Sequence, residues 1–264
     1  MKRYCLYLFI LIGISCSAEL KAQKNGTVYK GNDPAVRYTG RTLVSPDGSV
    51  AFDWVGTYLE TRFTGGKLSV KVSETGTSYY NVFVDGKLHK VVKVCGTDTL
   101  IHLVSGIDKR IHSLKIQKRS EGEFGKTTVH QFVLSGSGRL AEEPAVRTRH
   151  IEFIGNSLTC GYGTDGKHRD EPFLVETENC NLTFASMVAR YYDADYTLIA
   201  HSGRGAARNY GDSVRVSKVT MKDRMLNTFD EDLTHKWNFK EYRPDLVVIN
   251  LGSNDFSTEP HPYK

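Results

Sequence analysis

The stretch that decides the fold is IEFIGNSLTCGYG, residues 151–163. It opens with a short, mostly apolar run, residues 151–154, which leads directly into Gly155, Asn156 and Ser157. A buried strand that ends in a glycine-containing turn with a serine is typical of the nucleophile position in α/β hydrolases, because the turn lifts the hydroxyl above the carboxyl edge of the sheet. The stretch therefore predicts a strand followed by a candidate nucleophile, Ser157.

Two more apolar runs end in similar polar clusters. Residues 196–200 lead into HSGRG at 201–205, and residues 246–250 are followed, after Leu251, by GSND at 252–255. The carboxyl ends of parallel strands lie at one edge of a sheet. We therefore expect the three clusters to converge.

The three clusters hold groups suited to acyl transfer. A serine nucleophile needs hydrogen-bond donors directed at the oxyanion that develops during the reaction. We expect these donors to be the backbone N–H groups of Ser157 and Gly203 and the side-chain amide of Asn254. Their convergence is the main argument for a catalytic site.

Residues 23–145 follow a period of two. Apolar and polar side chains alternate over residues 68–72, and Asp85-Gly86 lies between two apolar runs, as the type I′ turn of a β-hairpin requires. Many short strands with frequent turns and no helical period predict an all-β domain, a jelly roll or β-sandwich.

The composition changes to that of a linker between Ser135 and Pro144. Beyond it, over residues 146–264, continuous apolar runs predict an α/β domain with a parallel sheet buried on both faces. We expect helices over residues 183–192 and 217–229. The first has one apolar stripe, made of Phe184, Met187, Val188 and Tyr191.

Residues 1–22 have the pattern of an export signal peptide. Lys2 and Arg3 precede an apolar run over residues 4–14, and residues 20–22 offer a cleavage site before Gln23. The run is too short to span a membrane. We predict an exported protein, periplasmic, at the cell surface or extracellular, and leave open whether Cys16 carries a lipid.

The charge excludes two classes of partner. The chain has a formal net charge of +5, of which residues 1–22 carry three basic and one acidic group, or +2, which leaves +3. So small a charge argues against binding to nucleic acid or to a membrane surface. One basic cluster alternates with apolar residues, which predicts the solvated face of a strand. Its members are Lys109, Arg110, Lys115, Lys118 and Arg119.

The cysteines give a weaker signal. Cys95, Cys160 and Cys180 lie beyond the predicted export signal, and Cys160 and Cys180 flank one loop. The sequence leaves open whether these two pair or remain free. No spacing of histidine and cysteine matches a zinc site, so we expect neither a metal nor a cofactor.

The motifs together resemble the SGNH, or GDSL-type, hydrolases. Ser157, Gly203 and Asn254 match the serine, glycine and asparagine blocks of that superfamily, although Asn156 stands where an aspartate is often found. Longer strings narrow the resemblance, which covers residues 24–264, to carbohydrate esterase family 2. These strings are residues 155–163, 177–179, 202–205 and 251–257.

The resemblance implies a fold, a substrate and an activity. The fold would be an N-terminal jelly roll followed by an SGNH hydrolase domain with a flavodoxin-like parallel sheet. The activity would be removal of acetyl groups from plant polysaccharides by a serine nucleophile, with acetylated polysaccharide or oligosaccharide as the partner.

The resemblance also implies a catalytic histidine in an Asp-x-x-His string after the asparagine block. The sequence ends at Lys264, so we expect this histidine beyond residue 264 and a hydrolase domain that is incomplete at its C-terminus. His261 is interpreted as a residue of the loop or substrate rim, His201 as structural and His168 as solvated.

The remaining candidates for substrate binding are Arg204, Asn209, Tyr210 and Asp255. The sequence leaves open whether the first three line the cleft or brace their loop, and Asp255 is also expected to support the Asn254 loop. Trp54 and Tyr58 lie within strand patterns and are interpreted as sandwich core rather than as sugar platforms.

Two other functions remain open from the sequence. The missing histidine is the best argument for a non-catalytic carbohydrate-binding protein, a truncated or decayed esterase. An esterase for lipids or small esters would keep the chemistry and change the pocket. Acetate release, and a comparison of acetylated glucomannan with longer acyl esters, would separate the three.

Overall fold

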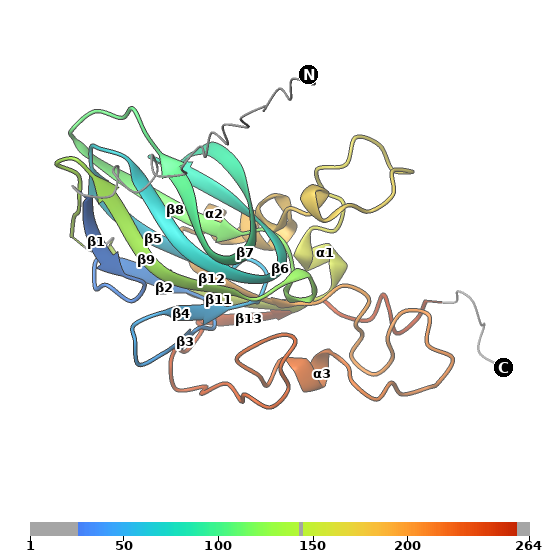
Figure 1. The fold of residues 1–264 in the computed structure, drawn as a ribbon. Helices are drawn as coiled ribbons and strands as arrows, with labels where there is room; N and C mark the ends of the chain where they lie inside the picture. Colours follow the sequence, from blue (N-terminus) through green and yellow to red (C-terminus); the bar gives the residue numbers. More distant parts are fainter. Residues whose placement is uncertain (1–25, 143–144, 258–264) are drawn as a thin grey trace, which may run out of the picture.

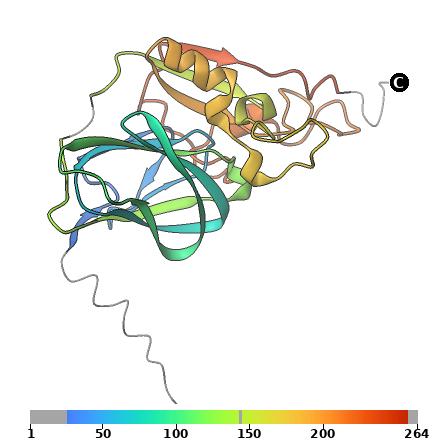
Figure 2. The same ribbon diagram turned by 90° about the horizontal axis from the view of Figure 1, so that it is seen from above.

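The computed structural model describes residues 26–142 and 145–257, in two parts that pack side by side (Figures 1 and 2). Residues 26–140 form a β domain, drawn in blue and green, and residues 150–257 form an α/β domain, drawn from yellow to red. The predicted export signal, Cys16 and His261 lie outside the described residues. Within the described residues, no helix is long and apolar enough to cross a membrane.

The β domain is one antiparallel sheet of ten strands that curls on itself. The central strand order is β10-β5-β8-β6-β9-β4-β3, with β1 on β9, β2 on β5 and β7 on β6. The strands are β1 (Gly26–Lys30), β2 (Val36–Thr39), β3 (Leu43–Val44), β4 (Val50–Phe52), β5 (Tyr58–Thr64), β6 (Leu68–Val84), β7 (Lys87–Val104), β8 (Ile111–Lys118), β9 (Thr127–Ser135) and β10 (Arg139–Leu140). A 3-10 turn, η1 (Gly122–Phe124), follows β8.

The predicted hairpin turn is confirmed. Strands β6 and β7 are joined by Asp85 and Gly86, whose φ angles are +50° and +75°. Two consecutive positive φ angles define the type I′ turn, whose twist matches that of the flanking strands.

The α/β domain is built on a parallel sheet of three strands in the order β12-β11-β13. They are β11 (His150–Gly155), β12 (Asp195–Ala200) and β13 (Leu246–Ile249), and they confirm the three predicted apolar runs as parallel strands. The predicted burial on both faces is wrong for β13, where Leu246, Val247 and Ile249 are 52%, 45% and 66% exposed. The helices are α1 (Ser157–Cys160), α2 (Phe184–Tyr191) and α3 (Met221–Arg224), with 3-10 turns η2 (Val175–Thr177) and η3 (Cys180–Leu182).

The predicted helix over residues 217–229 is wrong in length. Only α3 forms, beginning at a capping box between Thr220 and Asp223. Arg41 of the β domain donates to the carbonyls of Met225 and Asn227 at 2.6 and 2.8 Å. These carbonyls are therefore held by the other domain instead of by a further helical turn.

Helix α2 confirms the predicted element but packs through its other face. Ala185, Ser186 and Ala189 are fully buried, whereas the predicted stripe is more than a third exposed at every position. The small side chains let the helix lie close to β12. The exposed stripe is Phe184, Met187, Val188 and Tyr191.

The interface between the domains has its own apolar core. Trp54 is fully buried against Ile154, Ile199 and Met221, and Tyr58 packs with the core of the α/β domain. Both residues are buried, as predicted, but between the domains rather than in the core of the sandwich.

Part of the basic cluster is also buried at this interface, which contradicts the predicted solvated face. Lys118 and Arg119 are 0% and 2% exposed. The Lys118 ammonium donates to the Ser78 hydroxyl and to the carbonyls of Ser120 and Glu121, between 2.9 and 3.2 Å. An alternating pattern cannot reveal such a burial, because each donor finds its acceptor only in the folded chain.

Candidate active site

The three predicted clusters meet at the carboxyl edge of the parallel sheet, on the side where the chain continues from β11, β12 and β13 in Figure 1. The Asn156 side-chain amide donates to the Ser253 hydroxyl at 2.9 Å, which joins the serine cluster to the asparagine cluster. The Asn254 amide donates to the Arg204 carbonyl at 2.8 Å, which joins the asparagine cluster to the glycine cluster. The expected convergence is therefore present.

Ser157 is half-buried and opens helix α1. The Asn156 side chain caps the helix by accepting the N–H of Leu158 at 3.2 Å. A Cβ at Gly155 would collide with the Thr159 hydroxyl, so this glycine is required by close approach and not by a positive φ. Gly161 ends the helix in the left-handed region, with φ of +85°.

The candidate oxyanion donors are unengaged or only partly engaged. Among the described residues, no acceptor is bonded to the backbone N–H of Ser157 or of Gly203. The Asn254 side chain is 8% exposed and uses one of its two amide hydrogens on Arg204, which leaves the second for a ligand. Three donors suited to an oxyanion are thus available at one edge of the sheet.

Asp255 braces the loop after Gly203. Its carboxylate accepts the backbone N–H groups of Ala206, Ala207 and Arg208 between 2.6 and 2.9 Å. Burial acts to raise the pKa of this carboxyl, but the backbone hydrogen bonds outweigh burial and lower the pKa. Asp255 therefore supports the glycine loop, where the sequence assigned it to the Asn254 loop or to substrate.

The other substrate candidates divide between the interior and the surface. Asn209 is 8% exposed, and its amide donates to the Val219 carbonyl at 2.9 Å, so it braces the loop. Tyr210 is 59% exposed and Arg204 is half-buried, so both are accessible to a ligand.

His201 has both ring nitrogens bound. Its Nδ1 lies 2.7 Å from the buried Asp230 carboxylate, and its Nε2 lies 3.2 Å from Glu123. Burial acts to lower the pKa of the imidazole, but the bonds to Asp230 and Glu123 raise it to about 9. A histidine that is protonated at neutral pH and bonded at both nitrogens cannot accept a proton from a serine.

Sequence reasoning missed an aromatic stack beside the serine. Tyr162 stacks on Phe173 with ring centroids 3.9 Å apart, and Phe173 stacks on Phe124 of the β domain at 5.7 Å. Tyr162 is 51% exposed, and its backbone N–H donates to the Ser157 carbonyl at 3.2 Å. The signal that could have predicted this stack is the position of Tyr162 within the serine motif, residues 155–163.

Sequence reasoning also missed the buried polar residues that the β domain places behind the site. Arg119 donates to the Glu178 carbonyl at 2.7 Å, to the Glu176 carbonyl at 3.0 Å and to the Asp165 carboxylate. Glu121 and Glu178 are 1% and 0% exposed. Glu178 lies in the string 177–179 that supported the family resemblance, but no motif marks Arg119 or Glu121, because their partners are distant in sequence.

The three cysteines of the described residues do not form a disulfide. Cys95 is exposed, Cys160 and Cys180 are buried, and all three are free thiols. Two groups of described side chains have the composition of metal ligands: Glu121 with Cys160 and Glu178, and His201 with Asp230 and Glu231. Both groups are linked by hydrogen bonds and ion pairs, and the expectation of no metal remains a prediction.

The solved structure of a family two carbohydrate esterase from Clostridium thermocellum in complex with cellohexaose matches this fold. The TM-score is 0.80 and the sequence identity 34%, over 86% of this chain and 68% of that one. The chain belongs to carbohydrate esterase family 2.

Other comparisons agree with this family. Residues 38–144 match the family model Carbohydrate esterase 2 N-terminal, and residues 151–263 match GDSL-like Lipase/Acylhydrolase. Cellulase/esterase CelE of Acetivibrio thermocellus is 35% identical over 86% of this chain, and an acetylxylan esterase / glucomannan deacetylase of Cellvibrio japonicus is 33% identical over 83%. This chain spans 27% and 61% of the length of these two relatives.

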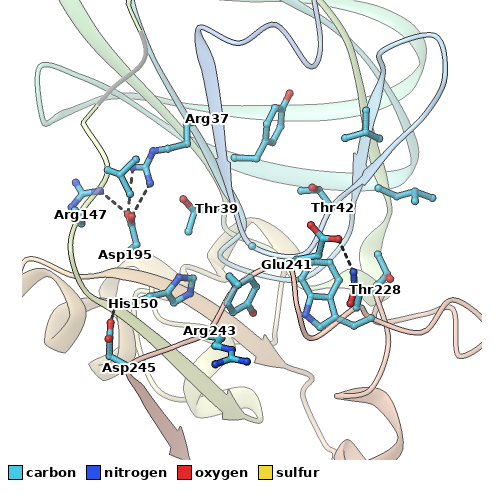
Figure 3. A pocket seen from close by; sticks show the side chains of 18 of the residues that line it. Arg37, Thr39, Thr42, Arg147, His150, Asp195, Thr228, Glu241, Arg243 and Asp245 are labelled. Atoms are coloured by element: carbon cyan, nitrogen blue, oxygen red, sulfur yellow. Dashed lines mark hydrogen bonds and ion pairs between the residues drawn. The ribbon is translucent and has the colours of Figure 1, made fainter.

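In this family 2 chain, a cavity of about 790 Å³ lies at the amino edge of the parallel sheet, opposite the candidate active site (Figure 3). In Figure 3, Arg37 and Arg147 point toward Asp195 at the start of β12, and both donate to its carboxylate. His150 at the start of β11 stacks on Tyr242 with centroids 4.5 Å apart. Ligands of parallel sheets bind at the carboxyl edge, so the size of this cavity does not make it the catalytic site.

Proposed function

We propose that the chain carries a carbohydrate O-acetyl esterase activity, with Ser157 as nucleophile. The observation that supports this most is the hydrogen bonding between the clusters that contain Ser157, Gly203 and Asn254, at the carboxyl edge of the sheet. Membership of carbohydrate esterase family 2 supports the carbohydrate class of substrate. Acetylated polysaccharides or oligosaccharides are therefore the proposed substrates.

The proposed reaction proceeds through an acetyl-serine. The Ser157 hydroxyl loses its proton to a histidine and attacks the acetyl carbonyl, forming an oxyanion that accepts hydrogen bonds from Ser157 N–H, Gly203 N–H and Asn254. The carbon–oxygen bond to the sugar then breaks, and the sugar oxygen takes the proton from the histidine. Water, activated by the same histidine, hydrolyses the acetyl-serine to acetate. Each important oxyanion donor contributes about 3–4 kcal/mol in comparable sites.

The proposed general base is a histidine outside the described residues. Among the described residues, no histidine is hydrogen-bonded to Ser157, and His201 is engaged at both nitrogens. The histidine expected after residue 264, with the C-terminal incompleteness that it implies, stays a prediction. Several other expectations also remain predictions: the jelly-roll class of the β domain, the domain boundaries, export, and roles for Arg204, Tyr210 and His261 in binding the sugar.

The experiment is acetate release from acetylated glucomannan and xylan by the full natural protein. We expect Ser157→Ala to reduce the rate at least about 10³-fold while binding to the polysaccharide persists, because only the nucleophile is removed. Activity retained in the folded variant would refute the assignment of Ser157. Binding by the wild type without any acetate release would favour the carbohydrate-binding function instead, and faster cleavage of longer acyl esters would favour a lipid or small-ester esterase.

A further inference from the structure

The carboxylate of Glu121 connects two segments of the candidate site. Its Oε2 accepts the backbone N–H of Ser202 at 2.6 Å and the thiol of Cys160 at 3.4 Å. Ser202 directly precedes Gly203, and Cys160 ends the helix that Ser157 begins. One buried carboxylate of the β domain therefore joins the nucleophile helix to the loop of the candidate oxyanion donor.

Gly203 depends on such a contact for its orientation. Its φ is +72°, and among the described residues no atom beyond its chain neighbours lies within 4 Å of a Cβ placed there. A glycine in open space has the widest choice of backbone conformations. The bond from Ser202 to Glu121 holds the peptide unit immediately before the one that carries the Gly203 N–H, and so limits that choice.

Glu178 holds Glu121 in place. Its Oε2 accepts the Glu121 backbone N–H at 2.9 Å. Burial, together with the charge of Glu121, raises the pKa of the Glu178 carboxyl.

We propose that Glu121 is a positioning residue of the esterase. Its carboxylate holds Ser202 and Cys160 so that the Gly203 N–H and the Ser157 hydroxyl keep the geometry needed for acyl transfer. The β domain then takes part in catalysis through a residue that does not touch the substrate. This inference rests on the proposed function of Ser157 and Gly203.

The test compares Glu121→Gln and Glu121→Ala with the wild type in the full natural protein, using acetylated xylan oligosaccharides. The glutamine oxygen can still accept the Ser202 N–H, so we expect kcat to fall about 10-fold in Glu121→Gln and about 100-fold in Glu121→Ala. KM should change less than about twofold, because the lost effect acts in the transition state. Glu142→Gln makes the same change at an exposed site and should leave both constants unaltered.

Ser157→Ala in the same assay separates the two proposals. If Ser157→Ala stays active, the proposed function fails. If Ser157→Ala is inactive while both Glu121 variants keep full kcat, or change only KM, the positioning role alone is overturned. A loss in Glu121→Ala that Glu121→Gln partly restores supports that role.

Hydrogen exchange gives a readout that does not need activity. The Ser202 amide should be protected in the wild type although the residue is only half-buried, and should exchange at least about tenfold faster in Glu121→Gln. If neither Glu121 variant folds, hydrogen exchange of the Ser202 amide in the wild type alone tests the proposal. A Ser202 amide that exchanges as fast as an unprotected one overturns the proposal.

Discussion

His201 lies directly before the candidate oxyanion loop and is held by carboxylates on both sides. Asp230 and Glu123 bind its two nitrogens, and Glu231 lies 3.4 Å from Nδ1. Arg224 donates to Asp230 and Glu231 and neutralises part of their charge. The folded chain therefore keeps a proton on His201 at a pH where the unfolded chain has released it.

This raised pKa predicts a pH dependence of stability. The contribution of His201 is complete below its unfolded pKa near 6.5 and is lost as pH rises through its folded pKa of about 9. Unfolding in urea between pH 6 and 10 should show a loss of roughly 3 kcal/mol in the wild type that is missing in His201→Gln. The same pH dependence in both proteins would contradict the raised pKa.

At the scale of the element, helix α2 buries alanines and exposes its larger apolar side chains. Ala189 is fully buried beside the sheet, whereas Met187 is 55% exposed. The packing face has room only for small groups, because the helix lies close to β12. The face that the sequence pattern marks as apolar is therefore less buried than the alanine face, although Phe184 contacts Phe153 of β11 with ring centroids 5.9 Å apart.

A pair of substitutions tests this orientation. Ala189→Leu should lower the free energy of unfolding by about 1–3 kcal/mol through overpacking. Met187→Lys should change it by less than about 0.5 kcal/mol, because the side chain already contacts water. Urea denaturation of this 264-residue chain measures both. A large loss in Met187→Lys with none in Ala189→Leu would mean that α2 packs through its apolar stripe.

At the scale of the whole molecule, Arg119 connects the two domains. Its guanidinium leaves the end of β8 and donates to two backbone carbonyls and one carboxylate of the α/β domain, as well as to Asn81 of its own domain at 3.3 Å. Each of its partners is a group that would lose a hydrogen bond without it. Arg119 is therefore, like Arg41, a buried cation that joins the two domains by hydrogen bonds.

We expect Arg119→Ala to cost about 3–5 kcal/mol of the free energy of unfolding, since it leaves buried acceptors unpaired. Arg110→Ala is the matched control, because Arg110 forms ion pairs with Asp85 and Asp108 but its side chain is 70% exposed. That exposed pair should contribute less than about 1 kcal/mol. Equal, small losses in both variants by urea denaturation would refute the structural role of Arg119.

Local patterns in the sequence were sufficient for the strands, the hairpin turn and the edge at which the candidate site forms. Each depends on neighbours within a few residues: the apolar runs of β11, β12 and β13, the Asp85-Gly86 turn, and the glycine beside Ser157. The direction of parallel strands then brings the three clusters together without further information.

Only the tertiary structure decided which polar side chains are buried and which face of a helix packs. The sequence pattern placed Lys118 and Arg119 on a solvated face and gave no signal for Glu121. The partners of all three lie in the other domain or in distant strands. A buried charge is stable only where several donors and acceptors meet it at once. That meeting is a property of the folded chain, whereas a strand or a turn is encoded by adjacent residues.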